Sequence, residues 1–155
     1  MPKHVKGRDR DKYYHLAKDQ GFRARSAFKL IQIDQRFNLL SKAKVCVDLC
    51  AAPGGWCQVA ARAMKPGSII LGVDILPIRD IRNVKTIQSD ITTAECRRMI
   101  NKELAGWGAD IVLCDGAPDI GAEYAKDAYV QNELVLAALK TATNHLVEGG
   151  TFITK

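Results

Sequence analysis

Long apolar segments are missing from this chain. No run of apolar residues approaches the roughly 20 that a membrane-spanning helix needs. The basic residues at its start are not followed by the apolar core of an export signal, so we expect neither a membrane span nor secretion. C-x-x-C pairs are absent too, and the odd cysteine count argues against a disulfide framework and against a metal site. In a reducing compartment we expect all five cysteines to act as small apolar side chains: Cys46, Cys50, Cys57, Cys96 and Cys114.

Two glycine-rich nucleotide signatures are also lacking. The chain has no G-x-G-x-x-G and no glycine followed by Lys-Ser or Lys-Thr. Their absence counts against an NAD-dependent dehydrogenase and against a P-loop nucleotide site. What remains is a chain of 155 residues, 47% apolar and 26% charged, which suits one globular domain.

The net charge of +6 is unevenly distributed along the chain. Residues 1–44 contain 12 Lys and Arg against 4 Asp and Glu, whereas residues 45–155 contain 11 against 13. A basic segment on a nearly neutral body is typical of a polyanion-binding protein, where the segment contacts phosphates. A solvated tail is the competing interpretation, and charge alone does not separate the two.

Helical and apolar segments alternate along the chain. A helix is predicted over Ser26 to Arg36, and later helices are predicted over 56–65, 94–105 and 125–147. Strands that are apolar throughout are predicted at 45–50, 68–75, 84–88, 110–115 and 151–155. This order predicts an α/β fold with a parallel sheet covered by helices on both faces. Thr92 or Thr93 is expected to cap the helix over 94–105.

The predicted domain organisation has two parts. Residues 1–21 form a basic N-terminal extension, and residues 22–155 form the α/β domain. The fifth strand stops at Lys155, which leaves the sheet half built. We therefore expect the remaining strands of this domain to lie beyond the chain.

Ligands of open parallel sheets bind beyond the carboxyl ends of the strands, and several notable residues stand there. Gly54 lies in the turn after the first strand, and Asp74 follows it by 20 residues, the spacing at which an acid reaches a ribose. Asp90 and Asp115 end or follow later strands, and each has an alternative explanation as a turn residue. Lys155 ends the fifth strand on the same edge, where partial loss of solvent would favour its acting as a base.

Other residues carry weaker signals. Trp56 alone is more often a core residue than a ligand contact, and Lys29 alone would be a surface lysine. Tyr13 and Tyr14 in the basic segment are candidates for stacking on nucleic-acid bases.

Several motifs in order carry a family resemblance. Residues 10–30 (RDKYYHLAKDQGFRARSAFKL) are followed by DLCAAPGGW, GVDI, SDIT, DGAP and ITK. This series resembles the FtsJ class of RNA ribose 2'-O-methyltransferases, which use S-adenosylmethionine and have a Rossmann-like methyltransferase fold. The chain looks most like the eukaryotic nucleolar members that modify large-subunit pre-rRNA. The resemblance thus implies RNA and a pre-60S ribosomal particle as partners, and a place in the nucleolus of the nucleus.

The resemblance also implies roles for individual residues. The family's catalytic tetrad is Lys-Asp-Lys-Glu, whose first three members match Lys29, Asp115 and Lys155, while the glutamate would lie beyond this chain. Gly54 and Trp56 match positions beside the methionine part of the cofactor. Asp74 matches its ribose contact, Asp90 its adenine contact, and Asp115 also lies near the methyl-bearing sulfonium.

Two alternatives remain within RNA biology. The tRNA anticodon-loop methyltransferases share the motifs of the first helices, and such an enzyme would be expected in the cytoplasm. A non-catalytic RNA-binding module could keep the fold, although the intact set Lys29, Asp115 and Lys155 argues against it.

Overall fold

The computed structural model describes residues 6–116 and 124–155, with side chains described at 12–116 and 129–155. Its helices are α1 (Lys6–Asp19), α2 (Ala27–Phe37), η1 (Leu40–Lys42), α3 (Gly55–Ala63), α4 (Ala94–Leu104) and α5 (Tyr124–His145). Its strands are β1 (Val45–Leu49), β2 (Ile69–Asp74), β3 (Lys85–Gln88), β4 (Ala109–Cys114) and β5 (Leu146–Thr154). Among the described helices, none is long and apolar enough to cross a membrane.

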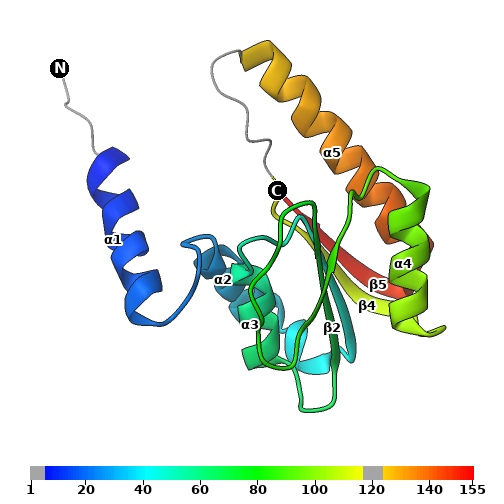
Figure 1. Ribbon diagram of the computed structural model, residues 1–155. Helices are drawn as coiled ribbons and strands as arrows, with labels where there is room; N and C mark the ends of the chain where they lie inside the picture. Colours follow the sequence, from blue (N-terminus) through cyan, green and yellow to red (C-terminus); the bar gives the residue numbers. More distant parts are fainter. Residues whose placement is uncertain (1–5, 117–123) are drawn as a thin grey trace.

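The five strands form one parallel sheet in the order β3-β2-β1-β4-β5 (Figure 1). The central strand β1 is buried along its whole length, as its apolar sequence predicts. It pairs with β2 on one side and with β4 on the other. The order in which successive strands are added to the sheet therefore reverses at β1. Ligands of such folds bind at this reversal, beyond the carboxyl ends of β1 and β4.

Helices cover both faces of the sheet, which confirms the predicted architecture (Figure 1). Alternate residues of β1 point to opposite faces: Val45, Val47 and Leu49 belong to the core under α4 and α5. Cys46 belongs to the second core, under α2 and α3. All five cysteines are free thiols, and four of them are buried, as expected for small apolar side chains.

The junction of α5 and β5 differs from the prediction. The helix ends at His145, not 147, and β5 begins at once at Leu146, not at 151. Gly149 and Gly150 therefore do not end the helix. The strand pairing explains this, because Leu146 already pairs with Ala109 and the register then shifts before the regular pairing of β4 and β5. The glycines occupy this irregularity, where Gly149 adopts a φ of +78°.

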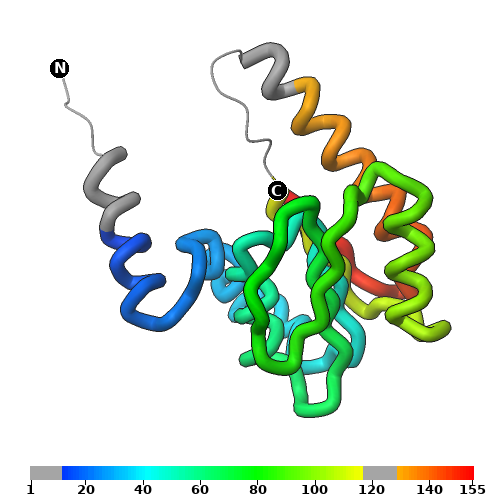
Figure 2. The backbone as a smooth tube through the Cα atoms, in the orientation of Figure 1, coloured from blue at the N-terminus to red at the C-terminus, as the bar shows by residue number. Residues whose placement is uncertain are grey.

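The basic segment contains a helix that the sequence interpretation did not predict. In Figure 2 the chain leaves the last turns of α1 and enters the body beside α2. Ala17 of this helix is buried in the same core as Phe22. The ring of Tyr13 lies 5.8 Å from that of Phe28, whereas Tyr14 is largely exposed. Of the two tyrosines, Tyr14 is thus the freer for an external partner.

Candidate active site at the carboxyl edge of the sheet

The turn after β1 is built around a glycine that no other residue can replace without strain. Gly54 is the N-cap of α3 and has a φ of +114°. A Cβ atom at this position would stand 2.6 Å from Cδ1 of Ile81. Both the backbone conformation and the close packing therefore require glycine at the N-terminus of α3, where Gly54 itself is buried.

Asp74 ties the turn after β1 to the segment after β2. Its Oδ2 accepts a hydrogen bond of 2.8 Å from the amide of Ala52, and its Oδ1 accepts one of 2.9 Å from the amide of Leu76. The side chain is almost completely buried. Asp74 thus shapes the loop around Gly54, and its carboxylate oxygens retain lone pairs for a further donor.

Asp90 occupies the turn that leads into α4. Its Oδ1 accepts hydrogen bonds from both the amide and the hydroxyl of Thr92. Thr93 caps the helix by accepting from the amide of Cys96 at 3.2 Å, as the sequence predicts. The turn explanation for Asp90 is therefore observed, and within the described part of the chain its Oδ2 has no hydrogen-bond partner.

Trp56 is a core residue that also borders the site. Its side chain is buried, and its indole N–H donates to the carbonyl of Ser26 over 2.8 Å. This bond joins the start of α3 to the start of α2. Trp56 therefore holds the segment bearing Lys29 against the loop around Gly54.

Asp115 and Lys155 meet because their strands are in register. Cys114 pairs with Thr154, so the next residue of each chain segment emerges side by side. The Nζ of Lys155 lies 3.3 Å from Oδ1 of Asp115. The Asp115 side chain is 14% exposed and that of Lys155 is 46% exposed, so the lysine is less desolvated than the sequence interpretation expected. Within the described residues, Oδ1 of Asp115 is buried and contacts the ammonium group of Lys155 without a well-directed hydrogen bond, so it can accept one from a ligand.

Lys29 stands apart from this pair. It lies in the first turn of α2 and is exposed. Among the described residues, Asp115 forms an ion pair with Lys155 and none with Lys29. The structure thus brings together two of the three residues that match the family's catalytic set, with Lys29 three positions after Ser26 at the border of the same site. Ala117 and Pro118 of the DGAP motif lie outside the described residues.

A small cavity of about 30 Å³ connects these parts. It is lined by Ala24 and Ser26 before α2, by the turn after β1, and by the carboxyl groups of Asp48 and Asp115. Its walls therefore combine apolar atoms with two acids. The Asp115 carboxylate in this lining suits a ligand that carries positive charge.

Asp48 is a site residue that the sequence interpretation left without a role. It is fully buried in the middle of β1, and burial raises its pKa to about 8. The thiol of Cys57 donates to its Oδ2 over 3.2 Å and opposes that rise. Asp48 consequently keeps its proton at neutral pH. The sequence signal was present, since a carboxylate interrupts an otherwise apolar central strand.

The thiols of Cys50 and Cys114 interact at the ends of β1 and β4. A hydrogen bond from Cys50 lowers the pKa of Cys114 to about 7, against the effect of burial, and raises that of Cys50. The expectation that these cysteines only fill space is therefore incomplete, because Cys114 has thiolate character directly before Asp115.

Arg23 is a second residue that the sequence interpretation missed. Its Nη1 donates to the carbonyls of Pro53 (3.2 Å) and Arg79 (2.6 Å), and its Nη2 donates to that of Asp80 (2.7 Å). One guanidinium group thus connects the segment before α2, the turn after β1 and the loop after β2. In the sequence Arg23 is one of several basic residues before the helix that carries Lys29. Such a residue would also be interpreted as a contact to RNA.

Two large apolar side chains are exposed just after Asp74. Ile75 and Leu76 are 62% and 59% exposed at the carboxyl end of β2. Apolar surface left in solvent beside a polar site is a common mark of a ligand platform.

Comparisons with known proteins agree with this geometry. The family model described as FtsJ-like methyltransferase matches residues 22–155. The chain is similar to the AdoMet-dependent rRNA methyltransferase spb1 of Aspergillus fumigatus, with 58% identity over 153 residues, or 99% of this chain and 19% of that protein. It is 57% identical to the pre-rRNA 2'-O-ribose RNA methyltransferase FTSJ3 of Pongo abelii over 94% of this chain and 17% of that one. The chain thus spans about a fifth of the length of these curated relatives.

A solved structure supports the same relationship. The crystal structure of a ribosomal RNA methyltransferase from Plasmodium falciparum superposes with a TM-score of 0.76 at 28% identity. The match covers 86% of this chain and 77% of that one. The predicted methyltransferase fold is therefore confirmed.

Proposed function

The chain belongs to the FtsJ-like methyltransferase family, and from this we propose that it is the catalytic part of an RNA ribose 2'-O-methyltransferase. Its methyl donor is S-adenosylmethionine and its substrate is large-subunit pre-rRNA. The observation that carries the proposal is 58% identity, over almost the whole chain, to a relative named as an AdoMet-dependent rRNA methyltransferase. The Asp115–Lys155 pair at the carboxyl edge also supports the proposal, because it offers groups that can handle the proton of a ribose hydroxyl.

The residues at the carboxyl edge fit this cofactor. The water-sized cavity beside Trp56 borders the place we propose for its methionine part, which would extend beyond this space, and the buried Oδ1 of Asp115 suits its positive charge. Asp74 would hold the ribose, and the exposed Ile75 and Leu76 offer an apolar surface to the adenine ring. Gly54 would bring the loop backbone close to the ligand, and Asp90 would turn Oδ2 to the adenine. When bound, S-adenosylmethionine supplies an already electrophilic methyl group.

The chain's own task is to place the ribose 2'-hydroxyl and to remove its proton. Lys155 Nζ would accept or direct that proton, because it sits at the exposed end of its strand, 3.3 Å from Asp115. Asp115 would fix the position of Lys155 through their ion pair. Lys29, exposed at the start of α2, would hold the ribose from the opposite side. Positioning of this kind supplies most of the acceleration when the methyl group is already activated.

The basic N-terminal segment would dock the RNA backbone. We propose residues 1–21 as an extension to a domain formed by residues 22–155, and the family match that begins at residue 22 supports this division. Lys3, Lys6, Arg8 and Arg10 supply much of its charge, and their side chains lie outside the described ones. If they contact phosphates, neutralising all four will weaken RNA binding and flatten its salt dependence. Unchanged RNA affinity would make the segment a mere tail.

The relatives' names favour rRNA over tRNA. Their function would place this chain on pre-60S particles in the nucleolus, where pre-rRNA is the available substrate. Mapping ribose methylation on purified rRNA and tRNA after incubation with the full-length protein separates the two substrates. Methylation confined to tRNA would overturn the rRNA assignment.

The decisive variant is Lys155→Ala in the full-length protein, with Lys140→Ala on α5 as a control for lost surface charge. We expect methyl transfer to fall by about 10²- to 10⁴-fold while affinity for S-adenosylmethionine stays within a few fold. Unchanged turnover would remove Lys155 from proton handling. Loss of cofactor affinity alone would show that it only supports the site. A wild-type protein that binds RNA but transfers no methyl group would be a non-catalytic module.

A further inference from the structure

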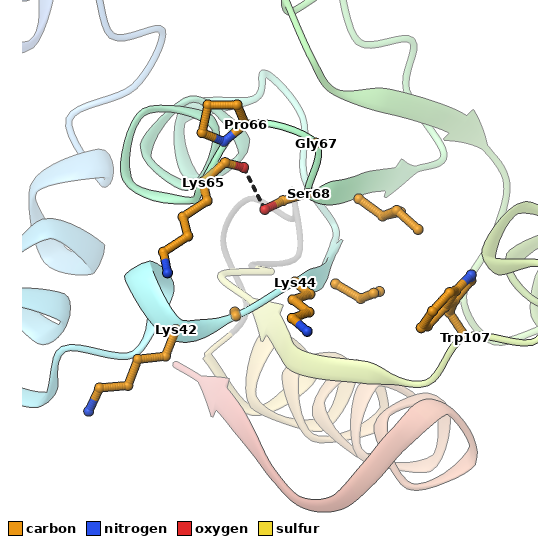
Figure 3. Close-up of a pocket in the computed structure, with 10 residues that line it drawn as sticks. Lys42, Lys44, Lys65, Pro66, Gly67, Ser68 and Trp107 are labelled. Atoms are coloured by element: carbon orange, nitrogen blue, oxygen red, sulfur yellow. Dashed lines mark hydrogen bonds between the residues drawn. The ribbon is translucent and has the colours of Figure 1, made fainter.

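The opposite edge of the sheet carries a pocket that the proposed methyl transfer does not use. This amino-edge pocket has a volume of about 340 Å³ and is lined by residues around the starts of β1 and β2, together with Trp107 before β4 (Figure 3). The volume lies within the usual range of ligand sites. Its floor is apolar, formed by Ala43, Val45 and Ile69.

The rim of the amino-edge pocket is basic, and no acidic side chain lines the pocket. Lys42, Lys44 and Lys65 line it. Within the described part of the chain, these three lysines take part in no salt bridge. Three cations in the lining outweigh the one carboxylate bound to the adjoining backbone, that of Asp110, and leave a positive potential that attracts an anionic ligand.

The backbone that carries two of these lysines is firmly held. Oδ2 of Asp110 accepts hydrogen bonds from the amides of Lys44 and Val45, at 2.8 and 3.0 Å. The carbonyl of Lys44 accepts from Ile69 at 2.8 Å. Lys65 begins a turn closed by the amide and the hydroxyl of Ser68 on its carbonyl. Two of the three cations therefore stand on a prearranged support, which lowers the cost of binding.

Trp107 is the unusual member of the lining. Its side chain is 65% exposed, although tryptophan gains more than any other residue from burial. The left-handed residues Ala105 (φ +49°) and Gly106 (φ +89°) lead the chain to it after α4. In Figure 3 the ring of Trp107 borders the pocket on the side away from Lys65, and the side chain of Lys42 extends away from the pocket. A flat aromatic ring is thus presented across an apolar floor from Lys44 and Lys65.

We propose that this pocket is a second RNA contact, in which a single-stranded nucleotide stacks its base on Trp107 and places its phosphates on Lys44 and Lys65. Aromatic stacking combined with lysine contacts to phosphates is the general way in which proteins hold single-stranded nucleic acid. The contact rests on the proposed RNA substrate and extends it. β1 spans five residues, so the two edges are roughly 15–20 Å apart, and one RNA molecule folded around the domain reaches both.

The lining favours RNA over an acidic peptide. The amino-edge pocket has lysines and no arginine in its lining, so its charge alone suits either anion and the exposed indole decides between them. Lysine is a mobile point charge that suits phosphates in no fixed geometry. The exposed indole is also better matched to a nucleobase, whose face is flat, than to a carboxylate side chain.

The test measures binding of a single-stranded RNA of about 20 nucleotides to the full-length protein over a range of salt concentrations. Replacing Lys44 and Lys65 together by Gln should reduce the slope of log K against log salt by about 1.4, because each phosphate contact on a single strand contributes about 0.7. Arg98→Gln with Lys140→Gln removes the same charge from α4 and α5 and should leave the slope unchanged. Trp107→Ala should weaken binding roughly 5- to 100-fold at fixed salt, and Trp107→Phe should retain most of the affinity.

Fluorescence provides a second measurement, which reports directly on Trp107 and does not use the salt dependence of binding. The chain has two tryptophans, of which Trp56 is buried and Trp107 exposed. RNA should quench the Trp107 emission, and the quenching should disappear in Trp107→Phe. An unchanged salt slope together with unquenched emission would overturn the proposal, even if poly-glutamate bound there instead. Methyl mapping is independent of both readouts, so failure of methyl transfer with an intact pocket response would refute the proposed function alone.

Discussion

The two edges of the same sheet are built on opposite principles. At the carboxyl edge three carboxyl groups are largely withdrawn from solvent, namely those of Asp48, Asp74 and Asp115, and Lys155 pairs with the last of them. At the amino edge they are exposed lysines around an apolar floor. Each edge also has one tryptophan, buried at the first and exposed at the second.

The difference teaches what each edge can do. Withdrawn carboxyl groups, of which Asp74 is held by two backbone amides, have few positions open to them, which suits a site for chemistry on a small cationic cofactor. Exposed lysines act over longer distances and are screened by salt, which suits a polyanion. A parallel sheet allows both, because all of its strands begin at one edge and end at the other.

The largest effect is expected from the pair at the carboxyl edge. Asp115→Asn removes the charge that holds Lys155, and we expect methyl transfer to fall by about 10²- to 10⁴-fold. Asp34→Asn is the matched control, because Asp34 accepts two backbone amides, of Leu39 and Leu40, away from this edge. It should lower the free energy of unfolding by about 1 kcal/mol and leave turnover unchanged. Equal losses of turnover in both variants would mean that carboxylates matter here only for folding.

The next effect concerns the buried Asp48. Its pKa in the folded protein is about 8 against 3.8 ordinarily, so between these values the folded state holds a proton that the unfolded state has lost. The contribution of Asp48 to the free energy of unfolding must therefore fall as the pH rises from about 4 to 8, by up to about 1.4 kcal/mol per pH unit. Asp48→Asn removes this slope while keeping an acceptor for Cys57.

Denaturant titrations of both proteins across this pH range give the difference directly, because the contributions of all other groups cancel. At pH 8 the variant should be more stable than the wild type by a few kcal/mol. Parallel curves would show that Asp48 ionises normally and that the carboxyl edge is less shielded from water than its contacts indicate.

The sequence predicts the scaffold well because its signals are local. Strand β1 is apolar except for Asp48 and is followed by glycines, so its place at the centre of a parallel sheet can be predicted directly. Thr93 as a helix cap is equally local. The start of β5 could not be predicted, because Leu146 is a strand residue only through its pairing with Ala109 on another part of the chain.

The site residues divide along the same line. Asp74 and Asp115 were found because they end predicted strands, where a simple rule of the fold points. Arg23 was missed because its importance lies in partners far along the chain, such as the carbonyl of Asp80. Asp48 is visible in the sequence as a carboxylate within an apolar strand, but its raised pKa follows from the burial that the fold imposes. Trp107 stands outside every recognised motif, and only its exposure in the structure distinguishes it.

Two left-handed glycines, one at each edge, allow a closer comparison. Gly54→Ala meets both a φ of +114° and Ile81 at 2.6 Å, so we expect a loss of about 2–4 kcal/mol and much weaker cofactor binding. Gly67→Ala has a φ of +85° and nothing within 4 Å, so only the backbone cost of about 1 kcal/mol applies. Thermal unfolding and cofactor titration measure both quantities. Equal costs in the two variants would show that the turn after β1 is not specially packed.

The smallest effect is expected from the guanidinium group that braces the carboxyl edge. Arg23→Met keeps the length of the side chain but removes three hydrogen bonds, to the carbonyls of Pro53, Arg79 and Asp80. Because these bonds are partly exposed, we expect a loss of about 1–2 kcal/mol in stability and a roughly tenfold weaker affinity for S-adenosylmethionine.

Arg25→Met is the control, since Arg25 is exposed and stands two positions further along the same segment. It removes the same charge and should leave cofactor affinity unaltered. If both variants weaken cofactor binding equally, the effect comes from the change in net charge, and Arg23 does not brace the loops. If only Arg23→Met does so, the carboxyl edge owes its shape to contacts between loops. The amino edge, whose lysines stand just before β1 and in one tight turn before β2, needs no such brace.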